Sequence, residues 1–237
     1  MTDCYSVLNI GIDIGSTTTK ITALSPADGS VVYSDYQRHH ADQVQSVKNA
    51  LAKFAESFGD VNIKCCFTGS GAKLLADSLG LPFVQEVVAN SIALQHDCQS
   101  VGTAIELGGQ DAKIIFFAKN SDSGRLAVSD MRMNGSCVYD ISGRCGVYAK
   151  TDIQPLLNQG VAKEDLALSA FHAIAKQTIG GLAQGRAIKG NVLYLGGPLT
   201  FMDELRKSFD KALKLKGKCP ENSLYYVALG AALSYKN

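Results

Sequence analysis

Two cysteines close together in the chain are the first residues whose spacing could do chemistry. Cys137 and Cys145 enclose the segment CVYDISGRC, eight positions apart. Such a pair could form a disulfide, occupy two core positions as small apolar side chains, or bind a metal. No CxxC or HxxxH spacing typical of zinc accompanies them. The spacing alone leaves these possibilities open.

The remaining cysteines give no sign of a disulfide framework. The chain has 7 cysteines in 237 residues, an odd number at irregular spacing. The first residues, MTDCYSVLNIGIDIG, lack the basic region and apolar run of a secretion signal. We therefore expect a reducing, cytoplasmic location. Cys65 and Cys66, in the strand-like segment NIKCCFTGS, are expected in the core.

A second possible chemistry lies in two similar glycine-containing segments, IDIGSTTTKI at 12–21 and IELGGQDAKI at 105–114. Each reads as a strand, a tight glycine turn and a second strand, which is a β-hairpin. Two matching hairpins so far apart indicate a duplicated domain. The two segments are separated by a constant offset of 93 residues, which aligns Asp13 with Glu106, Gly15 with Gly108 and Lys20 with Lys113.

Glycine turns of this kind can bind phosphate, because backbone N–H groups approach an anion without a Cβ in the way. Asp13, and Glu106 in the second hairpin, could hold Mg²⁺ through water, since that ion prefers oxygen ligands. Gln110 is our candidate for orienting the attacking water. The expected phosphate-binding residues are Gly15, Ser16, Thr17, Thr18, Lys20, Gly108 and Gly109.

A third glycine turn follows the strand-like segment NVLYL. Gly196, Gly197 and Pro198 in LGGPL are expected to face the ribose and α-phosphate. One glycine turn in a hairpin is usually only a turn. Three of them, two in a matched acid-x-Gly frame, favour facing clamps on the β- and γ-phosphates of ATP between two lobes.

The elements around these turns alternate between strands and helices, which indicates an α/β protein with mixed sheets. Helical periodicity is clear at 41–59, 163–184 and 199–215. We expect the segment 199–215 to form a single helix. We expect an N-terminal lobe at 1–99 and a C-terminal lobe at 100–237, and allow for the last helix packing back on the first lobe.

Composition and motifs exclude several classes of protein. The net charge of +1 offers no electrostatic case for nucleic acid or an acidic membrane surface. No run approaches the roughly 18 apolar residues that span a bilayer. The sequence contains neither a P-loop nor the GxGxxG of a dinucleotide-binding fold. His39 and His40, in YQRHHADQ, are expected to be surface residues.

The motifs together resemble one family. GIDIGSTTTK, TGSGAKLL, GGQDAKI, MNGSC, RCGVYAKTDIQPLLNQG and LGGPL are similar to segments of the ATP-dependent activators of 2-hydroxyacyl-CoA dehydratases, a group that includes the ATPase subunits of benzoyl-CoA reductases. The resemblance covers nearly the whole chain. It implies the two-lobed, actin-like (ribonuclease H-like) ATPase fold of sugar kinases, heat-shock chaperones and actin, with duplicated mixed sheets and flanking helices.

The resemblance also implies a mechanism. Family members are homodimers whose subunits share one [4Fe-4S] cluster, and Cys137 and Cys145 match its two ligands per subunit. ATP binding and hydrolysis change the angle between the subunits. An electron from a donor such as ferredoxin or flavodoxin then passes at low potential to a partner dehydratase or reductase. On this reading ATP or ADP, Mg²⁺ and the cluster are the cofactors.

The sequence departs from the family between the two cysteines. Family members have a glycine-rich turn, a helix and several tens of residues there, whereas here MNGSC leads almost directly to SGRC. Two other functions stay open: a sugar or small-molecule kinase of the same fold, and a nucleotide-gated regulatory module without a cluster.

Overall fold

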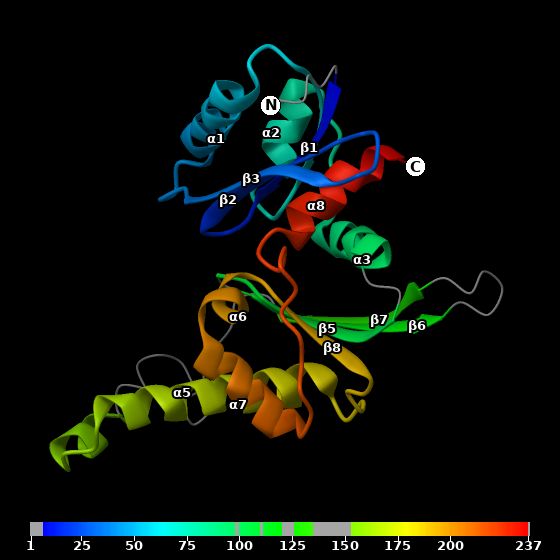
Figure 1. The fold of residues 1–237 in the computed structure, drawn as a ribbon. Coiled ribbons are helices and arrows are strands. Elements are labelled where there is room, and N and C mark those ends of the chain that lie inside the picture. The colour runs from blue at the N-terminus through cyan, green and yellow to red at the C-terminus, as the bar shows by residue number, and fades with distance from the viewer. Residues whose placement is uncertain (1–6, 98–99, 110, 120–125, 135–152, 237) are drawn as a thin grey trace. The chain divides into compact units, whose positions relative to one another are not determined.

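A computed structural model describes most of the chain, namely residues 7–97, 100–109, 111–119, 126–134 and 153–236. The chain divides into two compact units (Figure 1). The first comprises Met1–Gln99 together with Tyr225–Asn237, and the second comprises Ser100–Leu224. Among the described residues, every helix is too short or too polar to cross a lipid bilayer.

The first unit is built on a four-stranded mixed sheet in the order β3-β2-β1-β4. β1 and β2 form an antiparallel hairpin, β3 pairs antiparallel with β2, and β4 pairs parallel with β1. Strands β1 and β2 are buried along most of their length, as expected for the centre of a sheet that is covered on both faces. The strand bounds are Val7–Ile14, Thr18–Leu24, Val31–Arg38 and Asn62–Thr68.

Helices cover both faces of this sheet. Ile10, Ile12 and Ile14 of β1 pack in one core with Val47 and Phe54 of helix α1. The other face is covered by α8, which approaches so closely that a Cβ on Gly11 would lie 1.8 Å from the carbonyl oxygen of Ala228. α8 in turn packs on α3. The helix bounds are α1 Gln43–Phe58, α2 Lys73–Leu79, α3 Glu86–Asp97 and α8 Tyr226–Leu233.

The second unit repeats the same sheet, in the order β7-β6-β5-β8, with the same parallel and antiparallel pairings. Its core joins the inner strands to helices α5 and α7. The strand bounds are β5 Val101–Leu107, β6 Ala112–Lys119, β7 Leu126–Asn134 and β8 Asn191–Leu195. The helices are residues 153–158, α5 Lys163–Thr178, the π-helical turn η1 Ile179–Ala183, α6 Gly197–Phe201 and α7 Asp203–Leu213.

The two sheets confirm the duplication and the fold class predicted from the matched hairpins. Asp13 pairs directly with Lys20 across β1 and β2, and Glu106 pairs with Lys113 across β5 and β6. The repeat therefore places an acid and a lysine side by side at the same position in both units, as directly opposed residues share a face.

One predicted helix is wrong. The segment 199–215 was expected to form a single helix, but Met202 is extended, with φ −115° and ψ 96°, and separates α6 from α7. Helical periodicity continues through this break, so the pattern of apolar residues did not reveal it.

Candidate functional site

The hairpin of the first unit holds a partly buried ion pair beside its glycine turn. The Lys20 Nζ donates to Asp13 Oδ2 at 3.0 Å, and the two side chains are 12% and 5% exposed. A buried charge is costly unless it is paired, so each residue requires the other. Lys20, which was predicted as a phosphate ligand, thus forms an ion pair with Asp13, whose carboxylate was predicted to position Mg²⁺.

The second hairpin holds a larger version of the same arrangement. Lys113 lies 3.5 Å from Glu106 and 2.7 Å from Asp111, and its side chain is only 2% exposed. Asp111 stands where the first hairpin has Thr18, so the second turn carries an additional carboxylate. We did not select Lys113 as a site residue from the sequence, although its alignment with Lys20 was the signal that identifies it.

The two turns share one backbone geometry. The Gly15 N–H donates to the Thr18 carbonyl at 2.9 Å, and the Gly108 N–H donates to the Asp111 carbonyl at the same distance. These two glycine amides are therefore engaged within the turns. An incoming phosphate would meet the amides that follow each glycine instead, beginning at Ser16 and Gly109.

A further pair of glycines supports the turns from the neighbouring strand. Gly196, after β8, has φ +85°, and a Cβ there would lie 2.1 Å from the carbonyl oxygen of Leu107. Gly69, after β4, has φ +102° and would meet the carbonyl of Ile14 in the same way, at 2.3 Å. Ile14 and Leu107 are equivalent in the repeat, so Gly69 in TGSG is the counterpart of Gly196. Gly196 was selected from the sequence, whereas Gly69 was missed.

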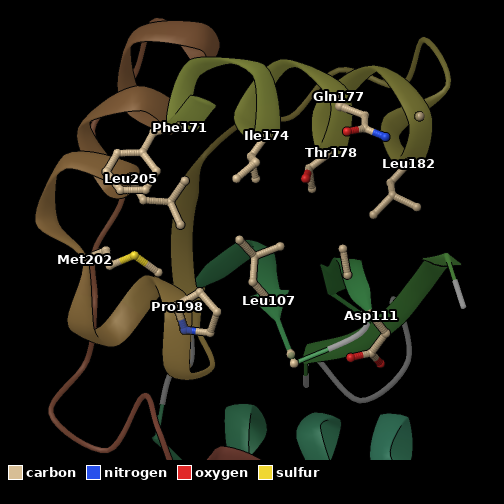
Figure 2. A pocket seen from close by; sticks show the side chains of 14 residues that line it. Leu107, Asp111, Phe171, Ile174, Gln177, Thr178, Leu182, Pro198, Met202 and Leu205 are labelled. Carbon is tan, nitrogen blue, oxygen red and sulfur yellow. The ribbon is translucent and has the colours of Figure 1, made fainter. Parts of the chain in front are cut away.

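The second unit contains a cavity of about 360 Å³ beside its hairpin turn. Figure 2 shows Phe171, Met202 and Leu205 gathered on one side, with Asp111 and Gln177 on the other. A volume of this size suits a small organic ligand. The lining residues are Leu107, Gly108, Gly109, Asp111, Ala112, Phe171, Ile174, Gln177, Thr178, Gly181, Leu182, Pro198, Met202 and Leu205.

The cavity brings together three residues that we predicted as nucleotide ligands, Gly108, Gly109 and Pro198. Gly196 is placed differently, because its N–H donates to the Ser223 carbonyl at 3.0 Å and is not available to a phosphate. Gln110, Cys137 and Cys145 lie outside the described residues. Within the described part of the chain, no cluster of three or more His, Cys, Asp or Glu side chains could hold a metal.

The cysteines of β4 are core residues, as predicted. Cys65 and Cys66 are 7% and 2% exposed. Burial raises the pKa of the Cys65 thiol to about 12 and also raises the pKa of Cys66. A thiol with so high a pKa remains protonated at neutral pH, and only the thiolate is a good nucleophile or metal ligand. These two residues therefore have a packing role.

Our expectation that both histidines lie on the surface is wrong for His39. His40 is exposed, but His39 is only 6% exposed and contacts the first glycine turn. Periodicity could not reveal this position, because His39 contacts a turn 24 residues earlier in the chain and not its own neighbours.

The chain is similar along almost its full length to a protein of known function. It is 25% identical to the (R)-2-hydroxyglutaryl-CoA dehydratase activating ATPase of Acidaminococcus fermentans, over 98% of each protein. No protein-family model matches it.

Two solved structures share its fold. Component A of the (R)-2-hydroxyglutaryl-CoA dehydratase of Acidaminococcus fermentans matches with a TM-score of 0.80 and 23% identity over 98% of both chains. The activator of the 2-hydroxyisocaproyl-CoA dehydratase of Clostridium difficile, solved with bound ADPNP, matches with a TM-score of 0.79 and 20% identity. That match covers 96% of this chain and 93% of the activator.

The buried lysine of the second hairpin gives a direct test of the site's construction. Replacing Lys113 with methionine leaves the carboxylates of Glu106 and Asp111 without this cation, and we expect the free energy of unfolding to fall by about 3–5 kcal/mol. Lys119→Met, at the exposed end of the same strand, should change it by less than about 0.5 kcal/mol. Urea unfolding measures both, and equal effects would contradict the assignment.

Proposed function

Because the chain is a distant, full-length relative of the 2-hydroxyacyl-CoA dehydratase activators and has their actin-like ATPase fold, we propose that it is an ATP-hydrolysing reductive activator. It uses ATP to drive a low-potential electron into a partner acyl-CoA dehydratase or reductase. The observation that carries the nucleotide part is the pair of matched glycine turns, each beside a largely buried acid–lysine pair.

In this proposal the residues of the two hairpins have distinct tasks. The amides and hydroxyls of both turns bind phosphates, while the carboxylates of Asp13 and Glu106 position Mg²⁺ through water. Positioning and charge stabilisation account for most of the catalysis of phosphoryl transfer, so few additional groups are needed. The proposed phosphate ligands are Ser16, Thr17, Thr18, Lys20 and Gly109, and Gln110 orients the water; the amides of Gly15 and Gly108 are engaged within the turns.

The cavity of the second unit is the proposed nucleoside site. Its apolar side, with Phe171, Ile174 and Met202, suits a flat aromatic base, and its hairpin side suits the phosphate end of the same ligand. Gly108 and Gly109 belong both to this lining and to the turn, which connects the two parts of the nucleotide.

Two adjacent glycines provide a test of this cavity. A Cβ built on Gly180 or Gly181 meets no atom within 4 Å, so packing within the protein does not require glycine at either position. Only Gly181 lines the cavity. We expect Gly181→Ala to weaken ATP binding about tenfold, because the new methyl group occupies ligand space.

The control for this test is Gly180→Ala. It should leave ATP affinity unchanged, and neither substitution should lower the thermal unfolding midpoint, since alanine favours helix over glycine. Titration calorimetry with Mg-ATP gives the affinities. Equal ATP affinity for the two variants would argue against the cavity as the nucleoside site.

Cys137 and Cys145 are the proposed cluster ligands. Iron–sulfur clusters are held by four cysteine thiolates, and two per chain in a symmetric homodimer supply this number. When bound, the cluster would supply the one-electron chemistry. The partner enzyme and an electron donor such as ferredoxin or flavodoxin are further parts of the proposal.

Iron analysis tests the redox part of the function. After anaerobic reconstitution we expect about two irons and two sulfides per chain, one half of a shared four-iron cluster. Cys137→Ser should abolish iron binding, while Cys219→Ser, a matched change at a partly exposed cysteine, should not.

A nucleotide-gated module without a cluster is the second candidate, favoured by the short segment between the two cysteines. The alignment with the Acidaminococcus fermentans ATPase runs over 260 residues, more than the 237 of this chain, so that relative contains residues that this chain lacks. ATP binding without iron in the wild-type protein would support this module and refute the redox function.

A further inference from the structure

The segment between β3 and α1 contacts the glycine turn of the first hairpin through one buried side chain. His39 immediately follows β3, and its ring nitrogen Nε2 lies 3.1 Å from the Gly15 carbonyl oxygen. Its own backbone N–H also donates to the Thr17 carbonyl, at 3.3 Å. One residue therefore contacts two carbonyl groups of a turn whose amides are the proposed phosphate ligands.

The second ring nitrogen determines how His39 is protonated. The Ala41 N–H donates to His39 Nδ1 at 3.1 Å, so this nitrogen acts as the acceptor and carries no proton. A neutral imidazole has one N–H, which must then be on Nε2. Nε2 therefore donates to Gly15, and both ring nitrogens are used in one tautomer.

The backbone around His39 is held in a costly conformation to make this contact. His40 and Ala41 both have positive φ, at 48° and 68°, in the left-handed region that residues with a Cβ seldom adopt. This geometry directs the Ala41 N–H at the ring. Unusual backbone of this kind persists where the surroundings fix it, and it is concentrated at functional sites.

Both ends of this segment are anchored. Arg38 pairs with Thr18 in the sheet on one side. On the other side, the Asp42 N–H donates to the His39 carbonyl at 2.7 Å, and the Asp42 carboxylate caps α1 by accepting from the Gln45 N–H at 2.9 Å. His39 is thus presented to the turn from a fixed support.

Holding the carbonyls fixes the direction of the amides. In a planar trans peptide the C=O and the following N–H point in opposite directions. With the Gly15 and Thr17 carbonyls directed at His39, the amides of Ser16 and Thr18 point away from it. Backbone N–H groups that point to the same side of a turn can bind an anion there.

We propose that His39 is a positioning residue for ATP: it orients the 15–18 turn so that its amides face the phosphates. The inference rests on the proposed nucleotide function and adds a residue to it. His39 does not contact the ligand, so its effect is on phosphate affinity and not on the chemical step.

Two substitutions of similar size separate the two ring contacts. Glutamine can place an amide N–H near the position of Nε2 and keep the donor to Gly15. Asparagine is shorter and can accept from the Ala41 N–H, but it places no donor at Gly15. Each variant loses one hydrogen bond, so we expect their thermal unfolding midpoints to fall by similar amounts.

ATP affinity should distinguish the two variants. We expect His39→Asn to weaken Mg-ATP binding about tenfold, while His39→Gln stays within about threefold of the wild type. The control His40→Asn should bind like the wild type, because His40 is exposed and asparagine accepts a left-handed conformation. Equal ATP affinities for the glutamine and asparagine variants would overturn the positioning role.

Nitrogen NMR of the free protein tests the same inference without a ligand. The ring of His39 should carry its proton on Nε2, and a proton on Nδ1 would overturn the inference whatever the ATP affinities. A wild-type protein that binds no Mg-ATP would instead refute the proposed function and with it the phosphate role of the turn. The two failures are therefore distinguishable.

Discussion

The position of both glycine turns depends on one electrostatic constraint. In each unit a largely buried lysine must be neutralised by an acid on the adjacent strand. Asp13–Lys20 and Glu106–Lys113 each join the first two strands of a unit next to a glycine turn. A lone charge at either position would be strongly destabilising, so the pairing requires the strands to lie in this register. The position of each turn relative to its sheet follows from it.

The duplication explains both what the units share and where they differ. The same turn hydrogen bond and the same close glycine, Gly69 or Gly196, recur in each. The second unit adds the Asp111 carboxylate and a cavity beside its turn. The first unit adds His39, whose ring contacts the Gly15 carbonyl of the glycine turn. The repeat thus supplies two similar glycine turns, each a proposed anion site, and the residues around the two turns differ.

Much of the fold could be predicted because its signals are local. The two hairpins and the apolar pair Cys65–Cys66 depend on neighbours in sequence, and both are found as expected. The missed features depend on distant contacts or single torsions. The Met202 break lies inside an unbroken apolar pattern. His39 contacts the β1–β2 turn, and the cavity forms where α5, η1, α6, α7 and the β5–β6 turn meet.

The central claim is that both glycine turns bind the phosphates of ATP. Hydrogen–deuterium exchange with and without a non-hydrolysable Mg-ATP analogue tests it most directly, since it reports on the amides of both turns in one experiment. The account predicts slower exchange at 15–18 and at 108–111 when the analogue is bound, while the edge strand β3 remains unchanged. Protection of only one turn, or of neither, would contradict it.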